Sequence, residues 1–175
     1  MTTRLKVRYY GDPVLRRMAQ PVRSVGPVER LFIKELISAM YAYDGTGLAA
    51  IQVGLEEQIF VADFGEGPFA VINPMILEAS SHETFMEEGC LSFPEIRFKV
   101  KRPESIRVRY VTESNMTVER ELSGLPAKIF QHETDHLNAK MIIDHASPEE
   151  REKFKPQLTR LETLAQKKKQ DLRRA

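Results

Sequence analysis

The chain has 175 residues, 42% of them hydrophobic and 29% charged, which is enough to bury a sizeable core within one domain. This composition excludes a disordered protein, and the absence of an apolar run of ~18 residues excludes an integral membrane protein. The single cysteine cannot form an internal disulfide, and residues 1–10, MTTRLKVRYY, lack the apolar segment of a secretory signal. We therefore expect a protein of the reducing cytoplasm.

The net charge of +1 is divided unevenly along the chain. Residues 148–175 carry nine basic and five acidic side chains, a net charge of +4, whereas residues 1–147 carry 17 basic and 20 acidic side chains, a net charge of −3. We therefore expect a mildly acidic body followed by a basic C-terminal helix that belongs to the same domain.

The first part of the chain predicts a helix that begins at Pro27 and is closed by Gly45. The helix is expected because apolar residues recur at spacings of three and four: Val28, Leu31, Phe32, Leu36, Ala39, Met40 and Tyr43. Residues 45–52, GTGLAAIQ, then predict a tight turn and a buried strand.

Strands are expected at 59–64 and at 70–72, where Asn73 and Pro74 stop the second one. Residues 105–112 and 116–122 predict a hairpin, because the first alternates apolar and polar side chains and a short polar turn joins the two.

A second helix is expected at 125–137, and a third from Ser147 to near the end, with Ser147 as its N-cap and Pro148 in its first position. Leu158, Leu161 and Leu164 are expected to pack against the body. Strands before and between helices, without βαβ alternation, predict an α+β fold with small mixed or antiparallel sheets around the helix at 125–137.

The sharpest chemical signal is residues 132–136, HETDH. Positions four apart on a helix share one face, so His132 and His136 can bind one metal ion, with Glu133 beside it as a general base. The plainer interpretation is a pair of ordinary helical histidines beside a solvated acid.

A catalytic metal site needs a third protein ligand. The extended motif with a downstream glycine and histidine fails, because Ala139 and Ile142 stand at those positions, and His145 lies off the helical face. Glu162 is a possible carboxylate ligand, although its charge-rich surroundings are typical of a solvated helix.

Cys90 is the other candidate ligand. It follows two acids and a glycine in a short loop that Pro94 ends, and it is the only thiol in the chain. A lone cysteine is more often a small buried hydrophobic residue than a ligand.

Three segments resemble, in order, the signature motifs of the peptide deformylase family: 45–52 (GTGLAAIQ), 88–92 (EGCLS) and 131–137 (QHETDHL). Residues 11–16 (GDPVLR) and 72–74 (INP) are also similar to that family. The resemblance covers most of the chain before the basic C-terminal segment and identifies residues 1–147 as a catalytic deformylase domain.

The resemblance implies that Cys90, His132 and His136 are ligands of one Fe²⁺ ion, replaceable by Zn²⁺, Ni²⁺ or Co²⁺, and that Glu133 is the acid–base group. It implies hydrolysis of the N-formyl group of the initiator methionine on nascent chains, with release of formate. The donor set alone does not choose iron, since the usual affinity order favours zinc.

The resemblance also implies how the substrate is held. The Gln52 side-chain amide and the Leu91 N–H would stabilise the oxyanion. Thr46, Gly47 and Gly89 match positions that bind the substrate backbone, where glycine permits a close approach of the peptide.

The pocket for methionine should be apolar. On the helix at 125–137 the candidates are Leu125, Ile129 and the aliphatic stem of Lys128, and Phe85 and Phe93 could contribute from flanking segments.

Two further expectations concern the surroundings of the site. Glu88 and Arg102 are expected to form a supporting ion pair of the exposed kind, which stabilises little. The family usually has glycine at the position of Ala139. Either Ala139 adopts a positive φ, at a cost of about 1 kcal/mol, or Asn138 takes the left-handed conformation instead.

Two other functions remain open at this stage: a different HExxH hydrolase, such as a peptidase using Glu162, and a non-catalytic metal-stabilised protein that docks acidic partners through its tail. For the deformylase, the expected partners are formyl-methionyl nascent peptides and, through basic residues at the C-terminus, the ribosome, with no membrane and no specific DNA binding. The basic residues are Lys167, Lys168, Lys169, Arg173 and Arg174.

Overall fold

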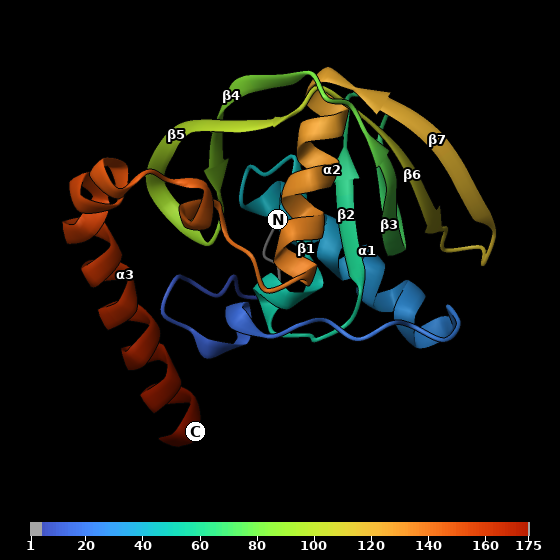
Figure 1. The fold of residues 1–175 in the computed structure, drawn as a ribbon. Coiled ribbons are helices and arrows are strands. Elements are labelled where there is room, and N and C mark those ends of the chain that lie inside the picture. Colours follow the sequence, from blue (N-terminus) through green and yellow to red (C-terminus); the bar gives the residue numbers. More distant parts are fainter. Residues whose placement is uncertain (1–4, 175) are drawn as a thin grey trace.

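The computed structural model describes residues 5–174, and of residues 168–174 only the helical backbone. Within this part of the chain, two antiparallel sheets curve around one central helix, α2 (Figure 1). The larger sheet has the order β1-β2-β3-β6-β7, and β4 pairs with β5 in the smaller one. The strands are Gly47–Ala49 (β1), Ile59–Asp63 (β2), Pro68–Ala79 (β3), Glu83–Cys90 (β4), Phe93–Pro103 (β5), Ser105–Val111 (β6) and Thr117–Ser123 (β7).

The helices confirm the expected α+β class, with one helix before the strands, one at the centre and one at the end. They are α1 (Pro27–Ala42), α2 (Gly124–Leu137) and α3 (Pro148–Arg174), joined by 3-10 helices at Pro13–Arg16, Ala50–Val53 and Ile142–His145. None of the described helices combines the length and the apolar character that a membrane span requires.

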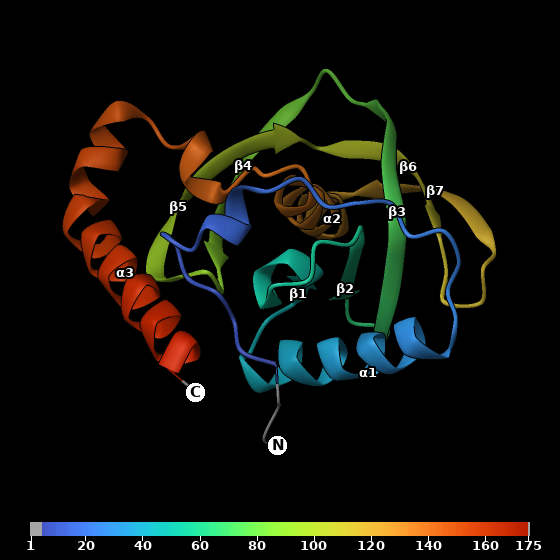
Figure 2. The same ribbon diagram turned by 90° about the horizontal axis from the view of Figure 1, so that it is seen from below.

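Strand β2 separates two parts of the core. Its side chains alternate, so Ile59 and Val61 pack with α1 while Phe60 and Ala62 pack with α2. The rings of Phe60 and Phe130 meet edge to face, with centroids 5.1 Å apart. The two helices therefore lie on opposite sides of β2, as Figure 2 shows.

Helix α2 is buried on nearly every side, since ten of its fourteen residues are buried. Its polar side chains are held by specific partners: Lys128 Nζ lies 2.7 Å from both the Arg102 carbonyl oxygen and Thr84 Oγ1. These bonds tie α2 to the β4–β5 sheet, the element that faces it across the site.

Helix α3 lies on the outside of β5 (Figure 2). Ser147 caps it as expected, since the Glu150 N–H donates to Ser147 Oγ at 3.1 Å. Phe154 and Leu161 are buried in a third part of the core, to which β5, α3 and the 3-10 helix Ile142–His145 contribute. Leu158 is packed against it. The expectation for Leu164 was wrong, because this side chain is 37% exposed.

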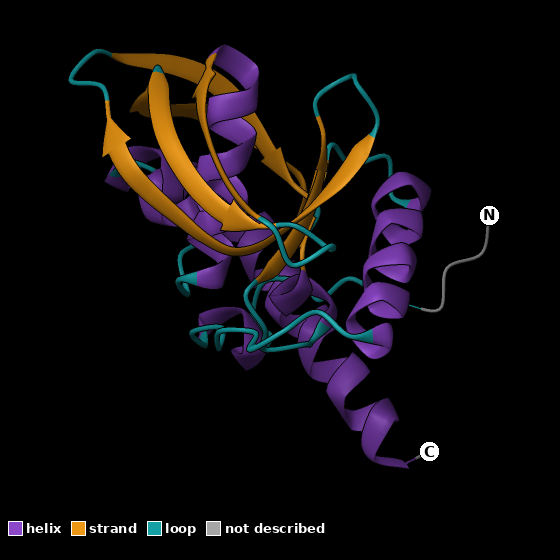
Figure 3. Ribbon diagram, turned by 90° about the vertical axis from the view of Figure 1, so that its right-hand side faces the viewer, coloured by secondary structure: helices purple, strands orange, loops and turns teal. Residues whose placement is uncertain are grey.

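Strand β3 does not stop at Asn73 and Pro74, as the sequence had suggested. It runs on to Ala79, with a register shift against β6 at this point. Figure 3 shows how strongly the long strands of the fold curve. Asn73 adopts φ 50°, and its amide exchanges two hydrogen bonds with the Val22 backbone, each 2.8 Å long. The side chain thus replaces a backbone partner at the irregularity.

The hairpin of β4 and β5 was not predicted, and the short loop assigned to Cys90 was wrong. Cys90 is the last residue of β4, opposite Phe93 at the start of β5. Residues 96–101, IRFKVK, alternate buried apolar and exposed charged side chains, so β5 carries a strand signal that the sequence analysis did not use. Strand β4 lacks that signal, because its one buried residue is the charged Glu88.

The buried face of the first helix, its end and the strand after it also differ from expectation. Val28 and Leu31 are 76% and 62% exposed, because Ile33 and Leu36 form the buried face instead. The helix ends at Ala42, and Asp44, not Gly45, adopts a positive φ of 58°. The expected buried strand is short, since β1 ends at Ala49 and a 3-10 turn follows.

Candidate metal centre and cleft

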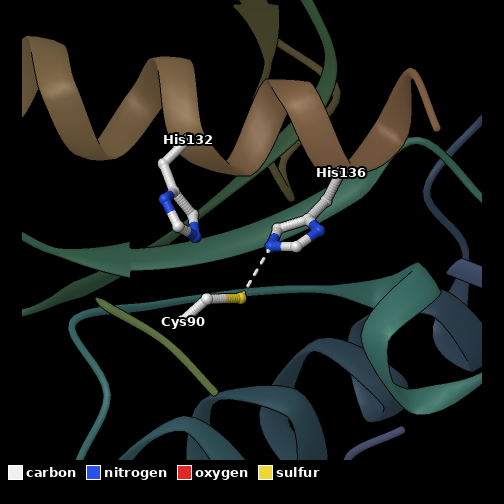
Figure 4. A group of neighbouring side chains, drawn as sticks. All are labelled: Cys90, His132 and His136. Carbon is white, nitrogen blue, oxygen red and sulfur yellow. Dashed lines mark hydrogen bonds between the residues drawn. The ribbon is translucent and has the colours of Figure 1, made fainter. Parts of the chain in front are cut away.

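Cys90, His132 and His136 lie together at the centre of the fold. One ligand atom from each residue lies within 4.8 Å of the others, and Cys90 Sγ is 3.2 Å from His136 Nε2. In Figure 4 the two imidazoles project from successive turns of α2 toward the thiol at the end of β4. A thiol and two imidazoles at this spacing form a donor set suited to a divalent transition metal.

Glu88 orients one of these ligands. Its Oε2 lies 2.9 Å from His132 Nδ1, and an ionised carboxylate only accepts, so Nδ1 carries the hydrogen and Nε2 keeps its lone pair. Arg102 holds the same carboxylate with two hydrogen bonds of 2.6 and 3.0 Å. Burial raises the pKa of Glu88, but His132 and Arg102 outweigh it and lower the pKa to about 2.

The Glu88–Arg102 pair is therefore confirmed, but the expectation that it is exposed was wrong. Only 4% of the Arg102 side chain and 7% of the Glu88 side chain are accessible. In this environment a broken pair would leave an uncompensated buried charge.

The thiol of Cys90 is set up to ionise. Burial raises its pKa, yet the neighbouring His136 and His132 lower it to about 5. A thiolate at neutral pH is the form that binds a metal.

Glu133 points into the same space, next to β1. Its Oε2 is buried and has no hydrogen-bond partner within the described chain, which suits a group that acts on a water or substrate. A Cβ at Gly47 would collide with its Oε1, so any larger residue there would displace the Glu133 side chain. Burial raises the pKa of Glu133 to about 6, against the opposing effect of the two histidines.

Gln52 has a fixed amide orientation. Its Oε1 accepts from the Ala49 N–H at 2.9 Å, and its Nε2 lies 3.1 Å from Ser92 Oγ and 3.5 Å from Cys90 Sγ. The N–H donors of the amide therefore face the metal-ligand cluster. Leu91 follows Cys90 directly and lines the same cleft.

A cleft of about 560 Å³ opens beside these residues. Its lining includes six of the residues expected to contact substrate: Thr46, Gly47, Gly89, Leu125, Lys128 and Ile129. Phe93 also lines it, but Phe85 does not and is 66% exposed, so that candidate was wrong. The neighbouring Met86 lines the cleft instead, together with the rest of β4 up to Cys90.

Two other sequence candidates lie elsewhere. Glu162 is not part of the ligand group; its α3 backbone packs against the Gly11 turn, where an added Cβ would lie 2.7 Å from Glu162 Cα. At the end of α2, Ala139 itself adopts the left-handed conformation with φ 59°, whereas Asn138 has φ −101°. The expected rescue by Asn138 was therefore wrong.

The sequence reasoning did not identify Ser92, Asp135 or a structural role for His145. Ser92 and Asp135 lie within the recognised motif segments or next to them, which was the available signal. The partners of Asp135 come from distant segments, so its surroundings could not be read from local spacing.

Comparison with known proteins agrees with this geometry. The family model described as polypeptide deformylase matches residues 4–152. The peptide deformylase of Thermotoga neapolitana is 51% identical over 146 residues, covering 83% of this chain and 89% of the relative. That of Thermotoga maritima is 49% identical over the same share of each.

Solved structures show the same fold. The crystal structure of peptide deformylase from Thermotoga maritima matches with a TM-score of 0.81 at 48% identity, covering 85% of this chain and all (100%) of that one. Peptide deformylase 1B of Arabidopsis thaliana, in complex with an inhibitor, matches with a TM-score of 0.87 at 33% identity over 93% of each chain. The chain therefore belongs to the peptide deformylase family and is a hydrolase of the deformylase type.

Proposed function

We propose that the protein holds one divalent metal ion on Cys90, His132 and His136 and removes the formyl group from the N-terminal methionine of newly synthesised proteins. The observation that carries this proposal is the convergence of one thiol and two imidazoles beside a buried carboxylate without a partner. The resemblance to the deformylase motifs points to Fe²⁺ as the ion in the cell, with Zn²⁺, Ni²⁺ or Co²⁺ as substitutes.

The protein residues divide the reaction between them. When bound, the ion would lower the pKa of a water molecule and polarise the formyl carbonyl. Glu133 takes the proton of the attacking water and delivers it to the leaving amine. The Gln52 amide and the Leu91 N–H donate hydrogen bonds to the oxygen on which negative charge develops.

The cleft holds the peptide in register for this attack. Backbone groups at Thr46, Gly47 and Gly89 offer hydrogen bonds along its walls, and the methionine side chain enters the apolar region at Leu125 and Ile129. Lys128 contributes only its stem, since its amine is bound to Thr84 and to backbone carbonyl groups away from the reaction.

We further propose that α3 is part of the catalytic domain and that its basic end contacts the ribosome in the cytoplasm, where formylated chains emerge. Burial of Phe154, Leu161 and Ala165 supports the first statement. Lys167 is exposed, whereas the side chains of Lys168, Lys169, Arg173 and Arg174 lie outside the described residues.

The direct test is formate release from a formyl-methionyl tripeptide by protein purified without oxygen. We expect turnover on this peptide and much slower reaction on its acetyl counterpart, because an added methyl group would crowd the carbon held between the metal ligands and Gln52. Equal rates on both peptides, or no formate, would contradict the proposal.

Two further measurements test the metal. Ferrous enzyme should lose activity in air, whereas Ni²⁺ enzyme should keep it, because ferrous iron and its thiolate ligand are both oxidisable. The Cys90→Ser variant should lose metal; a peptidase that used Glu162 instead would retain it.

A further inference from the structure

The charge network behind the metal ligands continues past Arg102 to a second carboxylate on α2, that of Asp135. Arg102 Nη1 lies 2.7 Å from Asp135 Oδ2, and the same oxygen lies 2.8 Å from His145 Nε2. A continuous chain of hydrogen bonds therefore links His145 to His132 through two carboxylates and one guanidinium.

His145 occupies an unusual position in this chain. It ends the 3-10 helix Ile142–His145, which follows α2, and it does not line the cleft. Its side chain is 21% accessible, whereas that of Arg102 is 4% accessible. Because the ionised Asp135 carboxylate can only accept, His145 Nε2 carries the hydrogen and donates it.

We propose that His145 is a positioning residue of the metal centre, acting through Asp135 and Arg102 to hold Glu88 against His132. The inference rests on the proposed metal site.

The physical reason is competition for one buried guanidinium. Arg102 serves Glu88 and Asp135 at once, and two carboxylates share its single positive charge. His145 supplies Asp135 with a second donor, so Arg102 is not drawn toward Asp135 at the expense of Glu88. Loss of that donor leaves Asp135 dependent on Arg102 and loosens the hold on the His132 ring.

The burial of Asp135 makes the effect of a lost donor larger. Only 20% of its side chain is accessible, and its Oδ2 meets both Arg102 Nη1 and His145 Nε2. Asp135 also precedes His136 directly in α2. The hydrogen bonds of Asp135 with Arg102 and His145 therefore hold the turn that carries this ligand.

The test uses Co²⁺ as the probe in the full-length protein. Affinity is measured by competition with a chelator, and the geometry of the site by the visible absorption spectrum of bound Co²⁺. His145→Ala should bind Co²⁺ about tenfold more weakly and shift the spectrum. His145→Gln, whose amide also donates, should stay within about twofold of the parent protein. His82→Ala, which removes an exposed histidine on the β3–β4 connection, is the matched control and should behave as the parent.

A double-variant cycle with Asp135→Asn tests the route. If His145 acts through Asp135, adding His145→Ala to Asp135→Asn should weaken Co²⁺ binding no further. Additive losses, an unchanged spectrum and affinity in His145→Ala, or a loss in His145→Gln as large as in His145→Ala would each overturn the inference. If the parent itself bound no Co²⁺ or released no formate, the proposed function would fail instead, so the two failures are distinguishable.

Discussion

Helices α2 and α3 follow the strands of the same chain but are stabilised in opposite ways. In α2, charged and polar side chains such as Lys128, His132 and Glu133 are buried, and the surrounding strands provide specific partners for most of their polar atoms. In α3, a narrow stripe around Phe154 and Leu161 is buried, and most of the remaining described side chains meet solvent. The candidate reactive side chains therefore lie on the helix whose polar groups are shielded from water, where electrostatic interactions are strongest.

The largest expected effect is on turnover, at the buried carboxylate of α2. Glu133→Ala should retain one metal ion per chain and lose about 10²–10⁴-fold in kcat, because the role proposed for Glu133 is proton transfer and not binding of the ion. Metal analysis beside a formate assay measures both quantities. Glu121→Ala, on the exposed face of β7, is the control and should keep normal turnover. A Glu133→Ala protein without metal, or with near-normal kcat, would refute the assignment.

The next largest effect is on stability, at the network that flanks α2. Arg102→Ala should lower the free energy of unfolding by about 3 kcal/mol or more, since the buried Glu88 and the half-buried Asp135 lose the guanidinium that they share. Arg109→Ala removes an exposed pair with Glu119 and should cost no more than about 1 kcal/mol. Urea unfolding of the two variants decides the matter, and equal losses would show that burial does not set the strength of the network.

A smaller effect of opposite sign is expected at the end of α2. Ala139→Gly should raise the free energy of unfolding by about 1 kcal/mol, because glycine adopts the left-handed conformation without strain. Ala127→Gly, inside the same helix, should lower it by about 1 kcal/mol or more through lost helix propensity and packing. Thermal unfolding of both variants measures the signs; a destabilised Ala139→Gly protein would contradict the strain.

The smallest effect on catalysis is expected in α3. Removal of residues 166–175 should leave activity on short formyl peptides near normal, because Phe154, Leu161 and Ala165 precede the cut. Co-sedimentation with ribosomes at low salt should fall, and binding of the full chain should weaken steeply as salt is raised. Loss of peptide activity would show that the end of α3 supports the fold, and salt-independent sedimentation would exclude a phosphate contact.

Local pattern predicted much of the fold. The hairpin of β6 and β7, the helix α2 and the capped start of α3 follow from alternation, helical spacing and a Ser-Pro pair, all of which act over a few residues. The pattern failed at β3, where Asn73 replaces a backbone partner, and at β4, whose one buried residue is the charged Glu88. Strand β5 does alternate apolar and charged side chains, and that signal was overlooked. On α1 the apolar Val28 and Leu31 were assigned to the wrong side, because periodicity alone does not say which stripe meets a sheet.

The candidate site also contains residues that local spacing predicted and residues that only packing brought together. The sequence by itself determined the i, i+4 pair of His132 and His136 with Glu133 between them, because helix geometry places such residues without reference to the rest of the chain. Cys90 was a residue-level candidate that became a ligand assignment through family resemblance. Only the tertiary structure decided that its sulfur meets a histidine 46 positions away. It also decided that Glu88, Arg102, Asp135 and His145 form one network with Arg102 buried at its centre, because partners 10 to 44 positions apart are brought together by packing, not by local spacing.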